Sequence, residues 1–351
     1  MTFLVILFAI LLFSLIIFIH ELGHFISARI FKVTVHEFAI GMGPAIFSWS
    51  GKGTSSTKYS IRCIPIGGYC KMEGEDGDSD SDGSFSSKSK FARFVILASG
   101  AFMNIVLGFL ISIVVVIATS GNGIATTTIE ELVPNSPVSA YIKPGDKIVE
   151  INGHSINIKQ EIAFALAMGD SETFDIKVER DGKTLEFKNI KPHEIEENGQ
   201  KYRIIGIKCK ITSPGFFTVL REGFYQTIYI GKMIFMSLSM LISGEAAMSD
   251  LSGPIGVVDQ MQSAVTSSGG GLAGFLNLLF LAGFISVNIG IMNLLPFPAL
   301  DGGRIFFILI EFITRRRIPP EKEGIVHFIG LILLFGLMIF ATWNDIVRIF
   351  N

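Results

Sequence analysis

The first thirty residues constrain the fold more than any other part of the chain. From Leu4 to Ile19 the sequence is apolar and uncharged, with Ser14 as its single hydroxyl residue. The apolar stretch continues to about Phe31, which is long enough to cross a bilayer, since a helical span needs roughly 20 residues. It has neither a basic start nor an Ala-x-Ala cleavage site, so we interpret it as a retained membrane span and not as a signal peptide.

The composition of the whole chain agrees with this interpretation. Of the 351 residues, 49% are hydrophobic, which is too apolar for an ordinary soluble domain and indicates an integral membrane protein. The formal net charge of −2 offers no basic surface, so the composition argues against a nucleic-acid partner. The three cysteines, Cys63, Cys70 and Cys209, are odd in number and far apart, which excludes a disulfide framework or a cysteine-rich zinc site.

We expect an α-helical integral membrane protein with about four transmembrane helices. The expected spans after the first are Phe94–Thr119, Leu272–Leu295 and Ile325–Thr342. Lysine and arginine flank these runs at the loops that we expect in the cytoplasm, which places both termini outside. We interpret residues 224–242, which carry Lys232 and several serines, as an amphipathic helix at the membrane surface, with a further span as the alternative. The sequence predicts a multi-pass membrane protein.

Two polar regions interrupt the apolar runs. In the first, Lys58–Ile66 alternates as a strand does, Gly67-Gly68 is typical of a hairpin turn, and Tyr69–Met72 is predicted to return. This hairpin is either a plain cytoplasmic element or one that dips toward the end of the first span at residues 20–24, where its free edge could pair with an unwound substrate. An acidic, serine-rich loop follows from Glu75. The second region, residues 124–212, is rich in strand and turn signals and is predicted to be a small β-rich extracytoplasmic domain. Within it, Phe174–Arg180 alternates, Asp181-Gly182 is a hairpin signal, and Lys183–Phe187 is predicted to return.

These features divide the chain into four parts. Residues 1–123 hold two spans, the hairpin and the acidic loop; residues 124–212 form the β-rich domain; residues 213–270 contain the interfacial helix and a linker; and residues 271–351 hold the last two spans.

The pattern His20-Glu21-x-x-His24 lies near the end of the first span. Two histidines four residues apart lie on one face of a helix, so both imidazoles can bind one metal ion. The glutamate beside them can deprotonate a water that the metal activates. Ionisable groups at membrane depth are costly and usually mark function, and a metal compensates all three at once. We therefore predict one Zn²⁺ per chain, with His20 and His24 as ligands and Glu21 as catalytic base.

A third ligand is expected near the end of the third predicted span. Pro296 and Pro298 interrupt the helix there, and broken backbone at membrane depth is tolerated only beside protein or a water-filled cavity. Asp301 follows them, at the same membrane end as the histidine pair by the charge argument, and is the natural third ligand. Asn293 in the same segment is a candidate for binding the substrate backbone. Asn104 in the second span is interpreted as a helix-packing residue and not as a catalytic group.

Together the two motifs resemble the site-2 protease family of intramembrane zinc metalloproteases, and within it the bacterial RseP/RasP branch. The resembling segments are His20–His24, Asn293–Gly302, Gly67–Glu75, Leu251–Gly256, and the pair Pro134–Pro137 with Gly145–Gly153, which is similar to a PDZ domain. The chain departs from the family at Ser99-Gly100-Ala101, where relatives usually have Ala-Gly-Pro, which puts the local helix geometry in doubt. It shows one PDZ-like region where some relatives have two.

The resemblance implies an endopeptidase that cuts single-pass membrane proteins within the lipid bilayer, such as anti-sigma factors or signal-peptide remnants, usually after another protease of the site-1 type has trimmed them. It implies a membrane-reentrant hairpin whose residues Gly67, Gly68 and Tyr69 bind substrate, together with Asn293, Pro296 and Pro298. Two non-proteolytic readings stay open: a zinc-dependent transporter or metal sensor that uses the same ligands, and a membrane scaffold with a degenerate site.

Overall fold

The structure is a computed structural model that describes residues 2–51, 57–75, 77, 81–134, 136–168, 172–197, 200–245, 252–316 and 318–350. Parts of the acidic loop after Glu75, and residues Asn135, Leu251 and Arg317, lie outside these ranges. The chain forms two compact units, one of Met1–Ser112 with Ile230–Asn351 and the other of Ile113–Tyr229.

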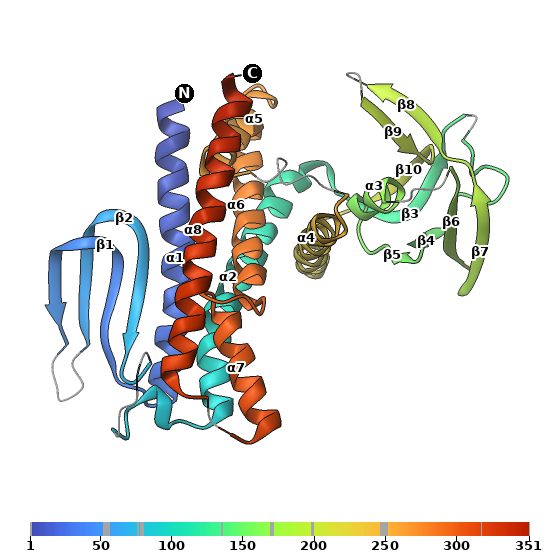
Figure 1. Ribbon diagram of the computed structural model, residues 1–351. Helices are drawn as coiled ribbons and strands as arrows, with labels where there is room; N and C mark the ends of the chain where they lie inside the picture. Colours follow the sequence, from blue (N-terminus) through green and yellow to red (C-terminus); the bar gives the residue numbers. More distant parts are fainter. Residues whose placement is uncertain are drawn as a thin grey trace. The chain divides into compact units, whose positions relative to one another are not determined.

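Long apolar helices build the first unit (Figure 1). They are α1 (Thr2–Ile30), α2 (Lys90–Thr119, as far as Ser112), the second part of α4 (Phe216–Ser243), α5 (Pro254–Thr266), α6 (Gly271–Leu294), α7 (Asp301–Thr314) and α8 (Pro320–Phe350). Within this unit, the N-terminal end of α1 and the C-terminal end of α8 lie on the same side (Figure 1).

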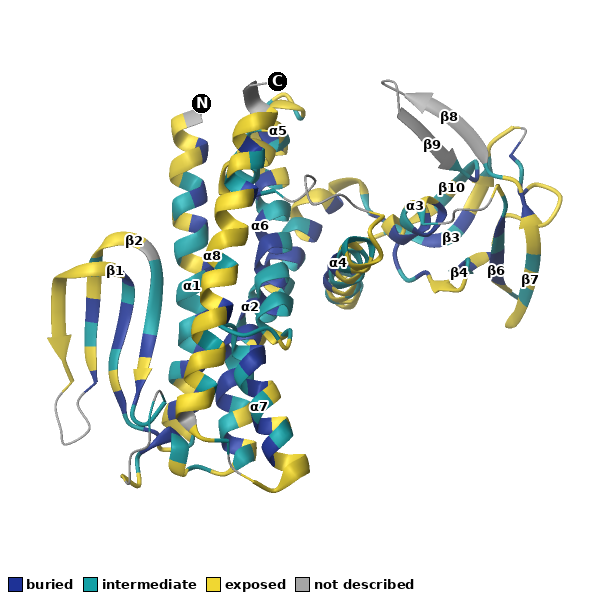
Figure 2. Cartoon of the chain, in the orientation of Figure 1, coloured by how far each residue is buried: buried dark blue, intermediate teal, exposed yellow. Residues whose placement is uncertain are grey.

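Five helices of the described chain are long and apolar enough to span a membrane: α1, α2, α4, α6 and α8. Helix α4 is the least apolar of them, with a mean hydropathy of 1.2 against 3.0 for α1. Most of α8 is exposed (Figure 2). Its exposed residues include the large apolar Phe328, Ile332 and Leu333. Such exposure is stable where lipid is the solvent, so these helices fit a helical membrane protein.

The helices of the first unit approach one another at glycines. A Cβ on Gly23 of α1 would lie 2.4 Å from the Ser99 carbonyl oxygen of α2, and one on Gly290 of α6 would lie 2.8 Å from the Ala101 carbonyl oxygen. Small residues permit this spacing, which supplies the close packing that holds helices together in lipid. Helix α2 is continuous through Ser99-Gly100-Ala101, so the departure from the family pattern does not break the helix.

The sheet of the first unit joins two long strands, β1 (Val35–Ser50) and β2 (Lys58–Met72), each of which bends back on itself (Figure 1). Residues 35–40 of β1 pair with residues 68–72 of β2 and also with 58–61, while residues 45–50 pair with 58–62. The prediction that Tyr69–Met72 pairs back onto Lys58–Ile66 is therefore wrong. Positive φ angles at Gly41, Gly43 and Gly67 bend the strands, and both halves of β2 pair with β1 instead.

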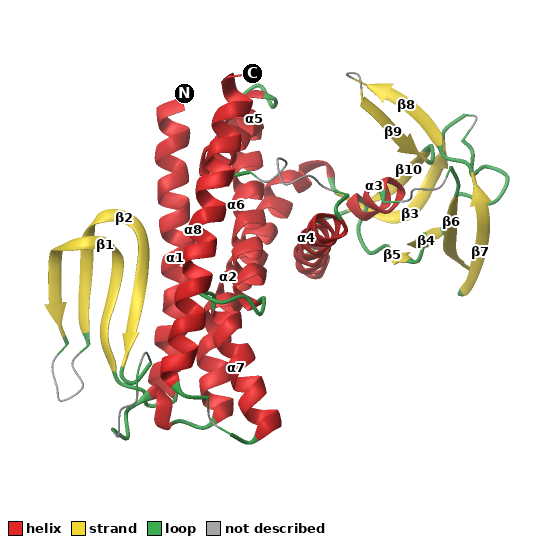
Figure 3. Cartoon of the chain, viewed as in Figure 1, coloured by secondary structure: helices red, strands yellow, loops and turns green. Residues whose placement is uncertain are grey.

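The second unit contains a sheet with strand order β10-β3-β4-β6-β7, with β5 beside β4 (Figure 3). Its strands are β3 (Ile124–Leu132), β4 (Lys147–Ile151), β5 (His154–Ser155), β6 (Phe174–Arg180), β7 (Lys183–Ile190) and β10 (Ile207–Thr212). The unit also contains helix α3 (Gln160–Ala167), the pair β8 (His193–Glu197) and β9 (Gln200–Ile204), the end of α2 and the first part of α4. Alternating apolar residues of the strands fill its core, including Ile148, Ile151, Ile176 and Val178. The predicted hairpin across Asp181-Gly182 is confirmed as β6–β7.

Candidate metal centre

The two motif histidines project from one face of α1 and meet each other. Their Nε2 atoms lie 3.2 Å apart and their rings stand nearly perpendicular, at 81°. Only 9% of His20 and 6% of His24 is exposed. The helical spacing of four residues produces this juxtaposition directly, because side chains at i and i+4 lie one above the other.

Asp301 completes the cluster from a distant part of the chain. It is the first residue of α7, and its Oδ2 atom lies 3.0 Å from His20 Nε2 and 3.3 Å from His24 Nε2. Among the described histidines, cysteines and acids, these three form the one group arranged to hold a metal ion. The structure thus brings together the three residues that the sequence nominates as ligands.

The three ligand atoms fit a zinc ion by their mutual spacing. Zinc bonds to nitrogen and oxygen are about 2.0–2.1 Å long and tetrahedral, which puts neighbouring ligand atoms about 3.3 Å apart. The observed separations of 3.0, 3.2 and 3.3 Å agree with this value. Moreover, Asp301 Oδ2 is buried without a hydrogen-bond partner among the described residues. A cation is the species that three converging lone pairs accommodate.

The orientation of His24 supports the same conclusion. Its Nδ1 atom lies 2.8 Å from the Ile96 carbonyl oxygen of α2, an acceptor, so Nδ1 donates its hydrogen there. In a neutral imidazole the other nitrogen then carries the lone pair, and Nε2 faces Asp301. This backbone contact fixes both the ring and its tautomer for metal binding.

Gly100 lets α2 pass directly over the two imidazoles. A Cβ at this position would lie 2.4 Å from His24 Nε2 and 2.8 Å from His20 Cε1. The importance of Gly100 depends on a helix crossing that no local pattern encodes, so the sequence alone shows it only as part of a family motif.

Glu21 faces a cavity of about 400 Å³ beside the ligand set. The cavity is lined by His20, Glu21, His24, Tyr69, Cys70, Lys71, Met72, Glu75 and Asp301. Cys70 of β2 lines this cavity together with Glu21. A carboxylate next to the metal ligands, in a cavity open to water, is the arrangement that a general base needs.

The outer edge of the β1–β2 sheet borders the same cavity. Among the described strands, residues 68–72 pair with β1 alone, so their other edge carries unpaired backbone groups. A Cβ on Gly68 would lie 3.5 Å from Glu21 Cγ, which puts this edge beside α1 at the motif. Tyr69 lines the cavity, and Arg62 donates a hydrogen bond to its hydroxyl.

The segment between α6 and α7 is folded tightly against its neighbours. Asn293 lies in the last turn of α6 and is not among the residues that line the metal cavity. Pro298 packs on Gly330 of α8, where an added Cβ would lie 2.4 Å from it, and Pro296 is exposed. The Ala299 N–H donates to Nδ1 of His327 of α8. His327 therefore supports the loop that delivers Asp301.

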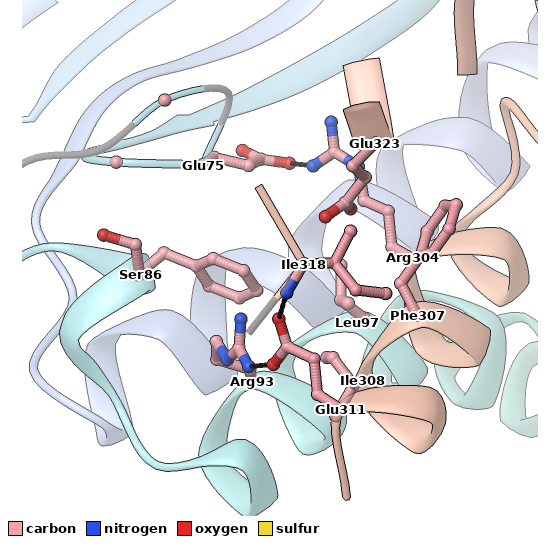
Figure 4. Close-up of a pocket in the computed structure, with 13 residues that line it drawn as sticks. Glu75, Ser86, Arg93, Leu97, Arg304, Phe307, Ile308, Glu311, Ile318 and Glu323 are labelled. Carbon is pink, nitrogen blue, oxygen red and sulfur yellow. Dashed lines mark hydrogen bonds and ion pairs between the residues drawn. The ribbon is translucent and has the colours of Figure 1, made fainter. Parts of the chain in front are cut away.

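Ion pairs fix α7 around the site (Figure 4). Arg304, one turn after Asp301, pairs with Glu75, which lines both the metal cavity and the neighbouring cavity of Figure 4. At the far end of α7, Glu311 accepts hydrogen bonds from Arg93 of α2 and from the Ile318 N–H. Both ends of the helix that carries Asp301 are thus fixed to other elements.

Two imidazoles, a carboxylate and an adjacent glutamate match the donor set and base that metal-dependent hydrolases use. Comparison with known proteins agrees. The model of peptidase family M50 matches residues 8–337, and the chain belongs to this family of zinc-dependent intramembrane proteases.

Curated relatives match along nearly the whole chain. A protein of Clostridium acetobutylicum named zinc metalloprotease is 38% identical, with 100% of both chains covered. A protein of the same designation from Fusobacterium nucleatum is 35% identical, again over 100% of both. The regulator of sigma-W protease RasP of Bacillus subtilis is 30% identical over 97% of this chain and 98% of that protein. A solved PDZ domain of an SdrC-like protein from Listeria innocua covers 25% of this chain and 96% of its own, at 26% identity and a TM-score of 0.22, which is too low to establish the fold.

Proposed function

We propose that His20, His24 and Asp301 hold the catalytic zinc and that Glu21 is the general base for cleavage of a substrate's transmembrane segment. The observation that carries this proposal is the convergence of His20 Nε2, His24 Nε2 and Asp301 Oδ2 within 3.0–3.3 Å, in a unit built of long apolar helices. Zinc bound there would supply Lewis-acid activation of water and of the scissile carbonyl.

The residues of the chain perform the proton transfers. The Glu21 carboxylate accepts the proton of the attacking water and gives it to the nitrogen of the leaving amine. Cys70 of β2 lines the same cavity as this carboxylate, on the sheet edge along which we place the peptide. Asp301 and the imidazoles remain in place, because Ile96 and the ion pairs of α7 hold their elements.

We place the substrate along residues 68–72 of β2. A transmembrane helix must unwind to expose a peptide bond, and its freed N–H and C=O groups are costly inside the lipid bilayer. Pairing with the open edge of β2 replaces those hydrogen bonds. Gly67 and Gly68 keep this edge free of side chains, and Tyr69 borders the bound segment.

We propose that Asn293, Pro296 and Pro298 contact the substrate on the side that faces away from β2. A Cβ on Gly302 would lie only 2.0 Å from the Leu295 carbonyl oxygen, so the end of α6 lies against the start of α7 and close to Asp301. This closeness supports a role for the Asn293 amide on the substrate backbone.

The remaining assignments follow the family. We propose that residues 124–212 form a PDZ domain outside the cytoplasm that limits or reads the substrate's outer part, after a prior cut by a site-1-type protease. We propose that the protein lies in a bacterial cytoplasmic membrane, with both termini outside the cytoplasm and the active site toward the cytoplasmic side. The β1–β2 sheet exposes Ile46, Phe47, Trp49 and Ile64, which suits a reentrant element in lipid. Helix α4 is either a fifth span or an interfacial helix.

Purified protein in lipid nanodiscs tests the assignment with a single-pass model substrate. Wild type is expected to cleave and to hold one zinc per chain by mass spectrometry. Glu21→Gln is expected to keep the zinc and lose cleavage, while Asp301→Asn loses both. Zinc transport or sensing that persists in Glu21→Gln, with no cleavage by wild type, would favour a transporter or sensor instead.

A further inference from the structure

We propose that Asn104 is a positioning residue that orients His20 for zinc, resting on the proposed ligand set. Asn104 lies on α2 and is fully buried. The Asn104 side-chain amide lies beside the His20 imidazole: Asn104 Nδ2 is 3.4 Å from His20 Nδ1, the ring nitrogen that does not face Asp301. Its Oδ1 atom is buried without a hydrogen-bond partner among the described residues. An unpartnered buried carbonyl beside a metal-ligating imidazole requires an explanation.

The metal-binding tautomer of His20 supplies that explanation. His20 Nε2 faces Asp301, so it is the atom that binds the metal and must carry the lone pair. The ring hydrogen then resides on Nδ1, where it points at the Asn104 amide. The two ends of an amide occupy the same space, so a half-turn of the Asn104 side chain directs Oδ1 to Nδ1–H. That single rotation satisfies both the orphan carbonyl and the imidazole.

The two imidazoles are held by one face of α2. Ile96 supplies a backbone carbonyl to His24, Gly100 leaves room above both rings, and Asn104 lies beside His20. These residues are spaced by four, so they form one row along the helix. At the third position of the row a side-chain amide, and not a backbone carbonyl, meets the imidazole.

The position of Asn104 is itself fixed from the side of α6. The Ser286 hydroxyl donates to the Asn104 carbonyl oxygen at 2.8 Å, and a Cβ on Gly290 would lie 3.3 Å from the Asn104 Cβ. Through these contacts, α6 holds the backbone of Asn104 in position. The amide therefore acts through His20 and does not itself touch the substrate or the metal.

Three variants separate positioning from packing. Asn104→Leu keeps the volume and removes the acceptor, Asn104→Asp keeps an oxygen that accepts from Nδ1–H, and Ser286→Ala disturbs the same helix contact without altering the amide. Loss of an outer-shell partner typically lowers metal affinity 10–100-fold. We expect Asn104→Leu to bind zinc about 10–100-fold more weakly than wild type and Asn104→Asp to lie within a few-fold of wild type. Ser286→Ala removes one of the two α6 contacts at Asn104 and keeps the amide, so its zinc affinity is expected to fall less than that of Asn104→Leu.

Zinc affinity is measured by chelator competition on the full chain in detergent, and the coordination is followed by visible absorption of the cobalt-substituted protein. We expect Asn104→Leu to shift or weaken the cobalt bands and Asn104→Asp to restore them. Wild-type zinc affinity in Asn104→Leu, or equal losses in Asn104→Leu and Asn104→Asp, would overturn the proposal. If Asp301→Asn leaves zinc affinity unchanged, the proposed ligand set is wrong, which is a separate failure.

Discussion

Substitution of Gly100 by alanine tests the helix crossing that shapes the metal centre. The added methyl group would lie 2.4 Å from His24 Nε2 and 2.8 Å from His20 Cε1, whereas carbon atoms in contact prefer about 3.5–4.0 Å. At least one imidazole must therefore move by about 1 Å. Metal–ligand distances tolerate only about 0.2 Å, so such a movement breaks a ligand bond.

The expected loss can be bounded from below. Changing an outer-shell partner costs about 10–100-fold in metal affinity, and losing a direct ligand costs more. We therefore expect Gly100→Ala to bind zinc at least about 100-fold more weakly than wild type and to be inactive at stoichiometric zinc. Helix propensity works in the opposite direction, because alanine is favoured over glycine inside a helix by about 1 kcal/mol.

The assay is zinc affinity by chelator competition, with cleavage of a single-pass substrate measured in parallel. Gly336→Ala in α8 is the silent control, since its Cβ would meet no atom within 4 Å. Gly108→Ala is the packing control, because its Cβ would lie 2.3 Å from a Val287 methyl group. We expect Gly108→Ala to lower thermal stability while keeping the zinc. Stoichiometric zinc and normal cleavage in Gly100→Ala would refute the crossing geometry.

Three further predictions concern the metal, α7 and the second unit. Chelation is expected to abolish cleavage, with recovery on adding zinc and unchanged helical circular dichroism; activity that survives complete zinc removal would exclude a zinc mechanism. Arg93→Ala leaves the nearly buried Glu311 carboxylate without its partner and is expected to cost about 3–5 kcal/mol by thermal unfolding, while the double variant Arg93→Met/Glu311→Leu recovers most of it. Burial alone would raise the pKa of Asp146, but Arg180 and the Lys143 N–H lower it overall, below its ordinary value of 3.8. Because the folded pKa is the lower one, this carboxylate stabilises the second unit fully above that value, and the stabilisation is lost as pH falls through the folded pKa. Protection of the β4 amides against hydrogen exchange, relative to their intrinsic rate at each pH, is expected to fall over that acid range in wild type, whereas Asp146→Asn is less protected at neutral pH and loses this acid dependence.

The strongest local patterns predicted their elements well. Apolar length predicted α1, α2, α6 and α8, and alternation with a turn signal predicted β6 and β7. These patterns succeed because a helix or a hairpin is specified by neighbours in the chain. The hairpin across Gly67-Gly68 was predicted wrongly, since strand partners are chosen by distant residues and β1 offered both halves of β2 a pairing surface.

The sequence alone determined which atoms are available for a metal centre: His20 and His24 share a face because four residues make about one helical turn. It also indicated Asp301 as a ligand, because this acid directly follows a helix interruption at membrane depth. Only the tertiary structure decided what surrounds them. Gly100 clears the space above the rings, while Ile96 and Asn104 contact their outer nitrogens. Those contacts arise where α2 crosses α1, and a crossing is set by packing between elements distant in the chain, which no local pattern encodes.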